Sequence, residues 1–263
     1  MLDGGGLKCF SEVYAYRYVL YQLVRQQVTL RYRRTIFGYL WTLLNPLLMM
    51  SVTAVVFSAI FKIDLKAYVF FLFPGVIAFN LFSATVTQSG QSLIGNEQLM
   101  KKIYLPKLLF PLAVSLAVLI DSLLMASFLI VILFAVGGAP TFSMLFIFPA
   151  YVLLFIFSFG LALVFSVGAI YFRDLQHIIS ILMQALVFLS PVYYRPESLS
   201  GRVEWVIELN PLTQFIELFR ASIGQGVFPA VAVVSETMLC ACLSLLIGLW
   251  FFRKFEHRIA FRM

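Results

Sequence analysis

The sequence has few charged residues and little that could serve catalysis. Charged residues make up 12% of the chain and hydrophobic residues 62%, whereas soluble domains have about 25% charged and roughly 45–50% apolar residues. The two histidines, His177 and His257, are isolated, and no Gly-Lys pair exists from which a phosphate-binding P-loop could be built. The patterns His-Glu-x-x-His and Gly-x-Ser-x-Gly are also missing. We therefore expect no enzyme and no catalytic residue or bound metal in this chain.

Two further absences argue against particular kinds of site and partner. Cys9, Cys240 and Cys242 have no spacing typical of a disulfide framework or a metal site, so we interpret them as small apolar side chains. The net charge of +7 comes from cations beside apolar runs and not from one basic face. That distribution argues against a nucleic-acid partner.

Long apolar runs are what the sequence has in abundance. They predict an all-α polytopic membrane protein, folded as one transmembrane domain over residues 1–263. A transmembrane barrel would show alternating strands of about 10 residues instead. Six runs are interpreted as membrane spans: residues 37–61, 68–87, 108–136, 142–172, 175–193 and 228–252.

The cations give the orientation. With six spans both termini share a side, and 14 of the 19 Lys and Arg residues fall on that side. They are Lys8, Arg17, Arg25, Arg31, Arg33, Arg34, Lys101, Lys102, Lys107, Arg173, Arg253, Lys254, Arg258 and Arg262. The other side has 5, namely Lys62, Lys66, Arg195, Arg202 and Arg220. Because Lys and Arg are retained in the cytoplasm, we expect a multi-pass protein with both termini cytoplasmic.

Two segments outside the spans are also expected to touch the membrane. Residues 12–35 form an apolar stripe at three- and four-residue steps with arginines on another face, which predicts an amphipathic interfacial helix. A helix packed on a soluble partner is the alternative. Residues 195–227 are too polar to span and too apolar for a solvated loop, and Asn210-Pro211 breaks them in two. We interpret them as a re-entrant helical hairpin; a cap lying flat on the outer face is the alternative.

A few polar and aromatic residues within the spans could carry function. Asp121 lies mid-span and should be paired, neutral or facing water, which fits either a proton relay or an interhelical hydrogen bond. Glu236 lies in the outer part of the last span. Aromatic rings recur at helical spacing and could either pack in the membrane or stack on sugars. Tyr151, Phe155 and Phe159 repeat every four residues in the fourth span, and Phe37 and Trp41 do so at the start of the first span, beside Tyr39.

The polar stretch between the second and third spans, residues 95–107, predicts a short cytoplasmic helix. Asn96 can cap it, Glu97 suits its first turn, and Pro106 ends it. Apolar side chains between charges indicate a docking element; a loop lying on the membrane interface is the alternative.

Several motifs, in order and spacing, resemble the ABC-2 type permeases for polysaccharide export. The segment from Arg31 to Trp41 resembles the start of these permeases, and residues 96–106 resemble their coupling helix. Ser190-Pro191-Val192 and Asn210-Pro211-Leu212-Thr213…Phe219-Arg220 resemble their external gate. The likeness is greatest to O-antigen transport permeases of the Wzm type, and capsule and teichoic-acid export permeases share the pattern.

The resemblance implies a homodimeric channel in the bacterial cytoplasmic (inner) membrane. Two copies of a separate ATPase, which bind ATP and Mg, would drive export of a polysaccharide carried on undecaprenyl diphosphate; no cofactor is expected in this chain. The resemblance implies three sets of functional residues besides the channel aromatics. They are Asn96, Glu97, Lys101, Lys102, Tyr104 and Pro106 for ATPase coupling, Arg31, Arg33 and Arg34 for the lipid diphosphate, and Pro191, Tyr193, Tyr194, Asn210, Pro211, Phe219 and Arg220 for the external gate.

Other readings of the same architecture stay open. An ABC-2 exporter of capsule, teichoic acid, lipid or drug would need the same spans, and a passive channel would need no ATPase. A membrane-embedded transferase is disfavoured by the missing catalytic patterns.

Overall fold

The computed structural model describes residues 12–32, 40–135, 137–138, 141–196 and 201–262, and within these ranges it is helical throughout, with no strand. This confirms the all-α class. The main helices are α2 (Arg17–Tyr32), α3 (Leu40–Phe61), α4 (Leu65–Gly90), α7 (Leu109–Ala135), α8 (Ile147–Tyr171), α9 (Leu175–Leu189) and α12 (Val231–Arg262). Shorter elements are α5 (Ser92–Gly95), α6 (Glu97–Lys102), η1 (Phe142–Phe146), α10 (Arg202–Glu208), α11 (Pro211–Phe219) and the π-helix η3 (Arg220–Gln225).

Five of these elements are long and apolar enough to cross a membrane. They are the segments Leu44–Phe61, Leu65–Gly90, Leu109–Ala135, Phe142–Tyr171 and Val231–Glu256. The expected fifth span, residues 175–193, is helical only over the 15 residues Leu175–Leu189. At 1.5 Å per residue that helix is about 22 Å long, short of a bilayer core of about 30 Å. Ser190 adopts an extended backbone directly before Pro191, which ends the helix early. Among the described residues, five segments are thus long and apolar enough to cross a membrane, and the sixth span stays a prediction.

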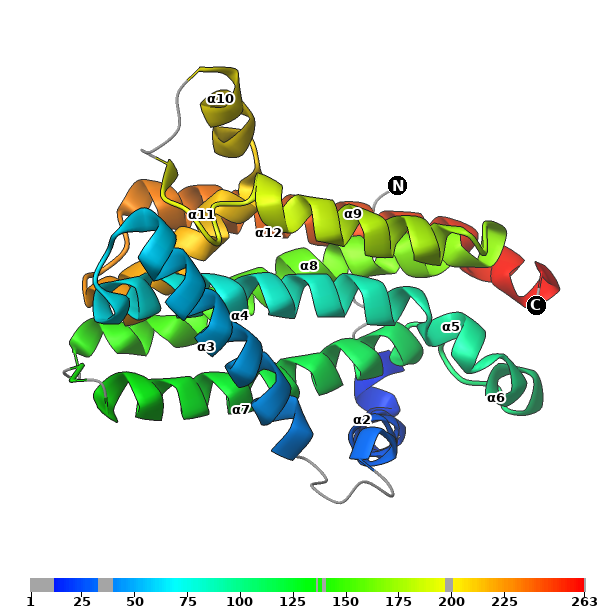
Figure 1. Ribbon diagram of the computed structural model, residues 1–263. Helices are drawn as coiled ribbons and strands as arrows, with labels where there is room; N and C mark the ends of the chain where they lie inside the picture. The colour runs from blue at the N-terminus through cyan, green and yellow to red at the C-terminus, as the bar shows by residue number, and fades with distance from the viewer. Residues whose placement is uncertain (1–11, 33–39, 136, 139–140, 197–200, 263) are drawn as a thin grey trace.

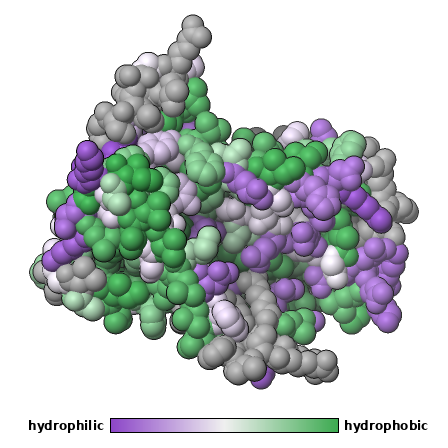
Figure 2. All heavy atoms as spheres, viewed as in Figure 1, coloured by the Kyte–Doolittle hydropathy of each residue, from purple (hydrophilic) through white to green (hydrophobic). Residues whose placement is uncertain are grey.

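The long helices form a bundle with two distinct ends (Figure 1). α4, α8, α9 and α12 run side by side, α7 lies along them, and α3 crosses obliquely over the front. One end gathers α5, α6, the turn between α8 and α9, and the C-terminal part of α12. These are segments that the charge count assigns to the cytoplasmic side. Figure 2 shows hydrophilic residues gathered over this end, whereas the surface over α3 is mainly hydrophobic.

α8 and α12 pack closely because small residues face each other where they cross. A Cβ added to Gly160 would lie well inside van der Waals contact with the backbone of Ser244, and one added to Gly248 would collide with the backbone of Gly160. The Ser244 hydroxyl also donates to the Phe157 carbonyl oxygen at 2.7 Å. Small residues that let backbones approach are a usual means of helix association in membranes. This contact fixes the frame on which the other helices pack.

α2 lies at the side of the bundle against α7. Leu23 is buried in a second apolar cluster with Phe110 and Phe252, while Leu30, near the C-terminal end of the same helix, is exposed. Arg17 and Arg25 are exposed. The helix therefore exists, with its apolar side partly against protein, and its position in a membrane interface stays a prediction.

The segment before α12 divides at Asn210-Pro211 as predicted. Asn210 caps α11 by accepting a hydrogen bond from the Leu212 backbone N–H at 3.1 Å. α11 is buried among α4, α8 and α12, whereas α10 stands apart from the bundle (Figure 1). Entry of both halves into a membrane as a re-entrant hairpin stays a prediction.

Candidate functional site: a polar cavity between two ends

A polar cavity of about 420 Å³ lies between α3, α4 and α7. Asp121, near the midpoint of α7, lines it with neighbouring Ser122. The other polar lining residues, Asn80, Ser83, Thr87 and Gln88, belong to α4. Both helices are among those long and apolar enough to cross a membrane, and Asp121 lies near the midpoint of its helix.

The α4 residues share a face because they recur at three- and four-residue steps, which places side chains one above another on a helix. Asn80 and Gln88 are exposed in this chain. Hydrocarbon cannot satisfy such groups, so polar residues within spans face protein or a water-filled cavity. Sequence reasoning found Asp121 but missed these α4 side chains, although the spacing of Asn80, Ser83 and Thr87 was visible within the second predicted span, residues 68–87.

The predicted channel aromatics lie in different surroundings. The Tyr151 ring is 3% exposed, and its hydroxyl lies 3.1 Å from the Ser122 hydroxyl and contacts the Ser122 carbonyl oxygen at the same distance. Phe159 is also buried, with its ring stacked on Phe155 at 6.0 Å. The rings of Tyr151 and Phe159 are enclosed by this chain alone, so contact with a passing glycan would need the helices to separate. Trp41 is 47% exposed at the start of α3, and Tyr39 lies outside the described residues.

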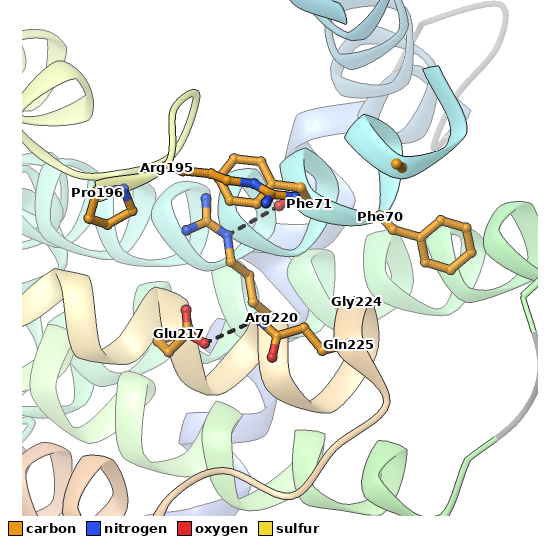
Figure 3. Close-up of a pocket in the computed structure, with 9 residues that line it drawn as sticks. Phe70, Phe71, Arg195, Pro196, Glu217, Arg220, Gly224 and Gln225 are labelled. Carbon is orange, nitrogen blue, oxygen red and sulfur yellow. Dashed lines mark hydrogen bonds between the residues drawn. The ribbon is translucent and has the colours of Figure 1, made fainter. Parts of the chain in front are cut away.

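At the end opposite α5 and α6, Arg220 ties three segments together. Its side chain is 3% exposed, and its Nε donates to the Phe71 carbonyl oxygen on α4 at 3.2 Å. Its Nη2 donates to the carbonyl oxygens of Pro191 and Val192, the latter at 3.1 Å. Figure 3 shows the guanidinium extending from η3 to Phe71. A buried charge is stable only with such hydrogen bonds.

The other predicted gate residues gather around this arginine. Asn210 Nδ2 donates to the Ser190 hydroxyl at 2.9 Å and to the Leu189 carbonyl oxygen at 3.2 Å. The Tyr193 carbonyl oxygen accepts from the Tyr68 hydroxyl at 2.7 Å, and the Tyr194 hydroxyl donates to the Phe188 carbonyl oxygen at 2.7 Å.

The remaining gate residues connect this region to the interior of the bundle. The buried Phe219 ring meets the Tyr151 ring edge-on at 4.9 Å, and Pro211 begins α11. The structure thus brings the residues named for the gate into one region.

At the end that the charge count assigns to the cytoplasm, α6 presents its side chains outward. Glu97 and Lys101 form an ion pair at 2.6 Å, and this hydrogen bond with its positive charge lowers the pKa of the Glu97 carboxyl. Lys102 is exposed, and Tyr104, just after the helix, is 92% exposed. The helix ends at Lys102, before Pro106, and the Asn96 amide donates to the Ser92 carbonyl oxygen instead of accepting from an α6 N–H. The helix and the N-cap position of Asn96 are as predicted, although its side chain makes no capping bond, and the predicted stop at Pro106 was wrong.

Lys107 joins this end to α12. Its Nζ donates to the Glu256 carbonyl oxygen at 2.6 Å, and burial lowers the pKa of its ammonium group. This hydrogen bond joins the segment after α6 to the C-terminal part of α12.

Some predicted residues and groups stay without a structural test. Arg33 and Arg34 lie outside the described residues, and Arg31 lies in the last turn of α2, with its side chain undescribed. Among the residues that the structure describes, no group of His, Cys, Asp and Glu could hold a metal ion. Cys240 and Cys242 are free thiols.

The chain is similar in sequence to known transport proteins. Residues 18–223 match the family model described as ABC-2 type transporter. The chain is 28% identical over 243 residues to an O-antigen export system permease protein RfbA of Klebsiella pneumoniae, covering 92% of this chain and 93% of the relative. It is 30% identical over 249 residues to the protein of that name from Myxococcus xanthus, with coverages of 91% and 95%. A polysialic acid transport protein KpsM of Escherichia coli is 24% identical over 240 residues, with coverages of 89% and 92%.

Proposed function

The chain belongs to the ABC-2 type transporter family, and from that premise we propose that it is the membrane subunit of an ATP-driven exporter of O-antigen-type polysaccharide. The cargo is carried on undecaprenyl diphosphate and moves from the cytoplasmic to the external side of the bacterial inner membrane. The names of the relatives from Klebsiella pneumoniae and Myxococcus xanthus support this cargo class.

The polar cavity between α3, α4 and α7 carries the proposal. A hydrophilic glycan needs a path that the apolar bilayer does not offer, and Asp121, Asn80, Thr87 and Gln88 supply polar groups at that depth. In one copy this polar face is incomplete, because Asn80 and Gln88 are exposed. A second copy would supply the opposite wall, so the transporting unit is a homodimer.

Energy comes from a separate ATPase. The chain has no Gly-Lys pair for a P-loop, so ATP and Mg are bound by the partner. The outward-facing Glu97, Lys101, Lys102 and Tyr104 form the docking surface for one ATPase copy. The contact between Lys107 and Glu256 passes its motion to α12.

Arginines before α3 meet the cargo's lipid end. Arg31, Arg33 and Arg34 stand next to a span, and guanidinium pairs bidentately with phosphate oxygens. The Arg220 region at the other end acts as the external gate, because one buried side chain there joins α4, η3 and the connection after α9.

Deletion of the gene tests the proposal. Cells lacking it should lose O-antigen-type polysaccharide from their surface and retain the glycan inside, and the wild-type chain should restore export. The name of the Escherichia coli relatives, polysialic acid transport protein, supports a second candidate cargo, a capsular polysaccharide of the polysialic acid kind. Loss of capsule with intact O-antigen would favour that candidate, and unchanged surface glycans would refute both.

A further inference from the structure

A second cavity lies beside Arg220 at the outer end of the bundle. Its volume is about 340 Å³, within the range of small-molecule sites. α4 contributes Phe70 and Phe71, the segment after α9 contributes Arg195, and α11 with η3 contributes Glu217, Arg220 and Gln225 (Figure 3). Residues far apart in the sequence thus converge on one hollow.

The base of this cavity is rigid. Arg220 is held by the carbonyl oxygens of Phe71, Pro191 and Val192, and its Cζ lies 3.7 Å from the centroid of the Phe71 ring. A Cβ added to Gly224 would collide with the Phe70 carbonyl oxygen, so only glycine lets η3 pass this close. π-helical turns such as η3 occur frequently at functional sites.

The rim is polar and nearly balanced in charge. The Arg195 Cζ lies 5.5 Å from the centroid of the same Phe71 ring, and Gln225 Nε2 donates to a Glu217 carboxylate oxygen at 3.3 Å. Arg195 and Gln225 are exposed and Glu217 is partly buried, so all three can meet a ligand from the outer side. A carboxylate in the wall repels phosphate. Planar carboxylate, amide and guanidinium groups beside aromatic rings instead suit neighbouring hydroxyls on a sugar ring.

We propose that this cavity is a saccharide-binding subsite that holds the emerging glycan at the external gate. The assignment rests on the proposed export function and names a contact that export alone does not require. A sugar bound here would touch Arg195 and Glu217, which flank the segments that Arg220 joins. The bound glycan would therefore hold the gate region while the chain behind it advances.

Photocrosslinking in exporting cells tests the subsite. p-Benzoylphenylalanine replaces the exposed cavity residue Ala67 or, as a control, Val231, an exposed residue at the same end that does not line the cavity. After irradiation, glycan adducts are measured on the permease band, and surface polysaccharide is measured in the same cells. We expect adducts at position 67 and at most traces at position 231.

Substitutions at the rim sharpen the test. Glu217→Gln and, separately, Gln225→Ala should lower the adduct yield at position 67 about tenfold. The first replaces a charged acceptor with a neutral amide, and the second removes an amide, and either loss is worth roughly that factor in affinity. Glu208→Gln, which alters an exposed carboxylate outside the cavity, should leave the yield unchanged. Immunoblots of the membrane fraction must show equal amounts of each variant.

Each outcome decides something different. Surface glycan without adducts at position 67, equal adducts at positions 67 and 231, or adducts that neither rim substitution lowers would overturn the subsite and leave the export proposal intact. Surface glycan that does not depend on this chain would overturn the export proposal and the subsite with it.

Discussion

Arg220 lies with its guanidinium over the ring of Phe71, 3.7 Å from the ring centroid, while its Nε donates to the carbonyl oxygen of the same residue. Phe71 of α4 thus contacts η3 through both its ring and its backbone carbonyl oxygen. Further bonds to Pro191 and Val192 bring in the connection after α9. One arginine side chain thus joins the ends of three segments, namely α4, η3 and the connection after α9.

Replacing Arg220 with lysine should destabilise the protein. An ammonium group is a point charge without the planar guanidinium fork, so it cannot keep bonds to all these carbonyls. Because hydrogen bonds to charged groups are worth about 1.5–3 kcal/mol each, we expect a loss of roughly 3 kcal/mol. The measurement is thermal unfolding of the purified protein, with Lys62→Gln, an exposed cation at the same end, as the control. Equal melting temperatures for Arg220→Lys and wild type would contradict this role.

Thr87→Cys, introduced into a chain whose three native cysteines are replaced by serine, should react with a hydrophilic thiol reagent in membranes. Thr87 lines the cavity that contains Asp121, and we expect that cavity to hold water. Val152→Cys on α8, which is 56% exposed but outside the cavity, is the control and should react at least about tenfold more slowly, because thiolates do not form in hydrocarbon. Equal rates at both positions would mean that the cavity is not a water path.

Tyr104→Ala combined with Glu97→Ala should uncouple ATP hydrolysis from export without preventing insertion. Both residues project from the predicted docking surface, and Tyr104 is 92% exposed. Truncating an aromatic anchor at an interface costs about 2 kcal/mol or more in binding. ATPase activity and surface glycan are measured together, with Phe228→Ala, an exposed aromatic at the opposite end, as the control. Unchanged export per ATP hydrolysed would exclude this surface from coupling.

Aromatic residues of the proposed channel should influence glycan length unequally. Trp41→Ala and Phe155→Ala should shorten the exported chains if these rings guide the glycan. Phe148→Ala, which alters an exposed ring on the same helix as Phe155, should not. Tyr151→Phe keeps its enclosed ring and loses only the contacts with Ser122, so we expect about 1 kcal/mol of lost stability and normal chain lengths. Normal lengths in every variant would reduce these rings to packing residues.

Gly160→Ala should disrupt the crossing of α8 and α12. The added methyl group would overlap the Ser244 backbone, and overpacking of this kind costs about 1–3 kcal/mol. Gly95→Ala, where a Cβ would have no atom within 4 Å, is the matched control. Fluorescence-detected size-exclusion after heating reports the surviving folded fraction. A Gly160→Ala variant as heat-resistant as Gly95→Ala would show that the crossing tolerates separation.

The sequence predicts most of the helices because hydropathy is a local property. The third predicted span, residues 108–136, differs from α7 (Leu109–Ala135) by one residue at each end. The break at Asn210-Pro211 was equally visible, because proline restricts the residue before it. The early end of α9 was not, since Val192 and Tyr193 are apolar and extend the hydrophobic run past the helix.

Side-chain surroundings depend on contacts distant in sequence and were harder to foresee. Tyr151 belongs to a four-residue repeat of aromatic rings that could face a channel, yet Phe219 and Ser122 enclose it. Arg220 was named for the gate only through family likeness; nothing local indicated that it would reach Phe71, 149 residues away. Glu217 and Arg195 were missed for the same reason.

The mass of the complex shows whether this chain works as a dimer driven by separate ATPases. The chain is isolated gently from its native membrane with its partners, and native mass spectrometry gives the composition. We expect two copies of the 29.8 kDa chain with two copies of a soluble ATPase. A chain that is isolated alone, with no ATPase bound under any nucleotide condition, would exclude an ATP-driven dimer and favour a passive channel.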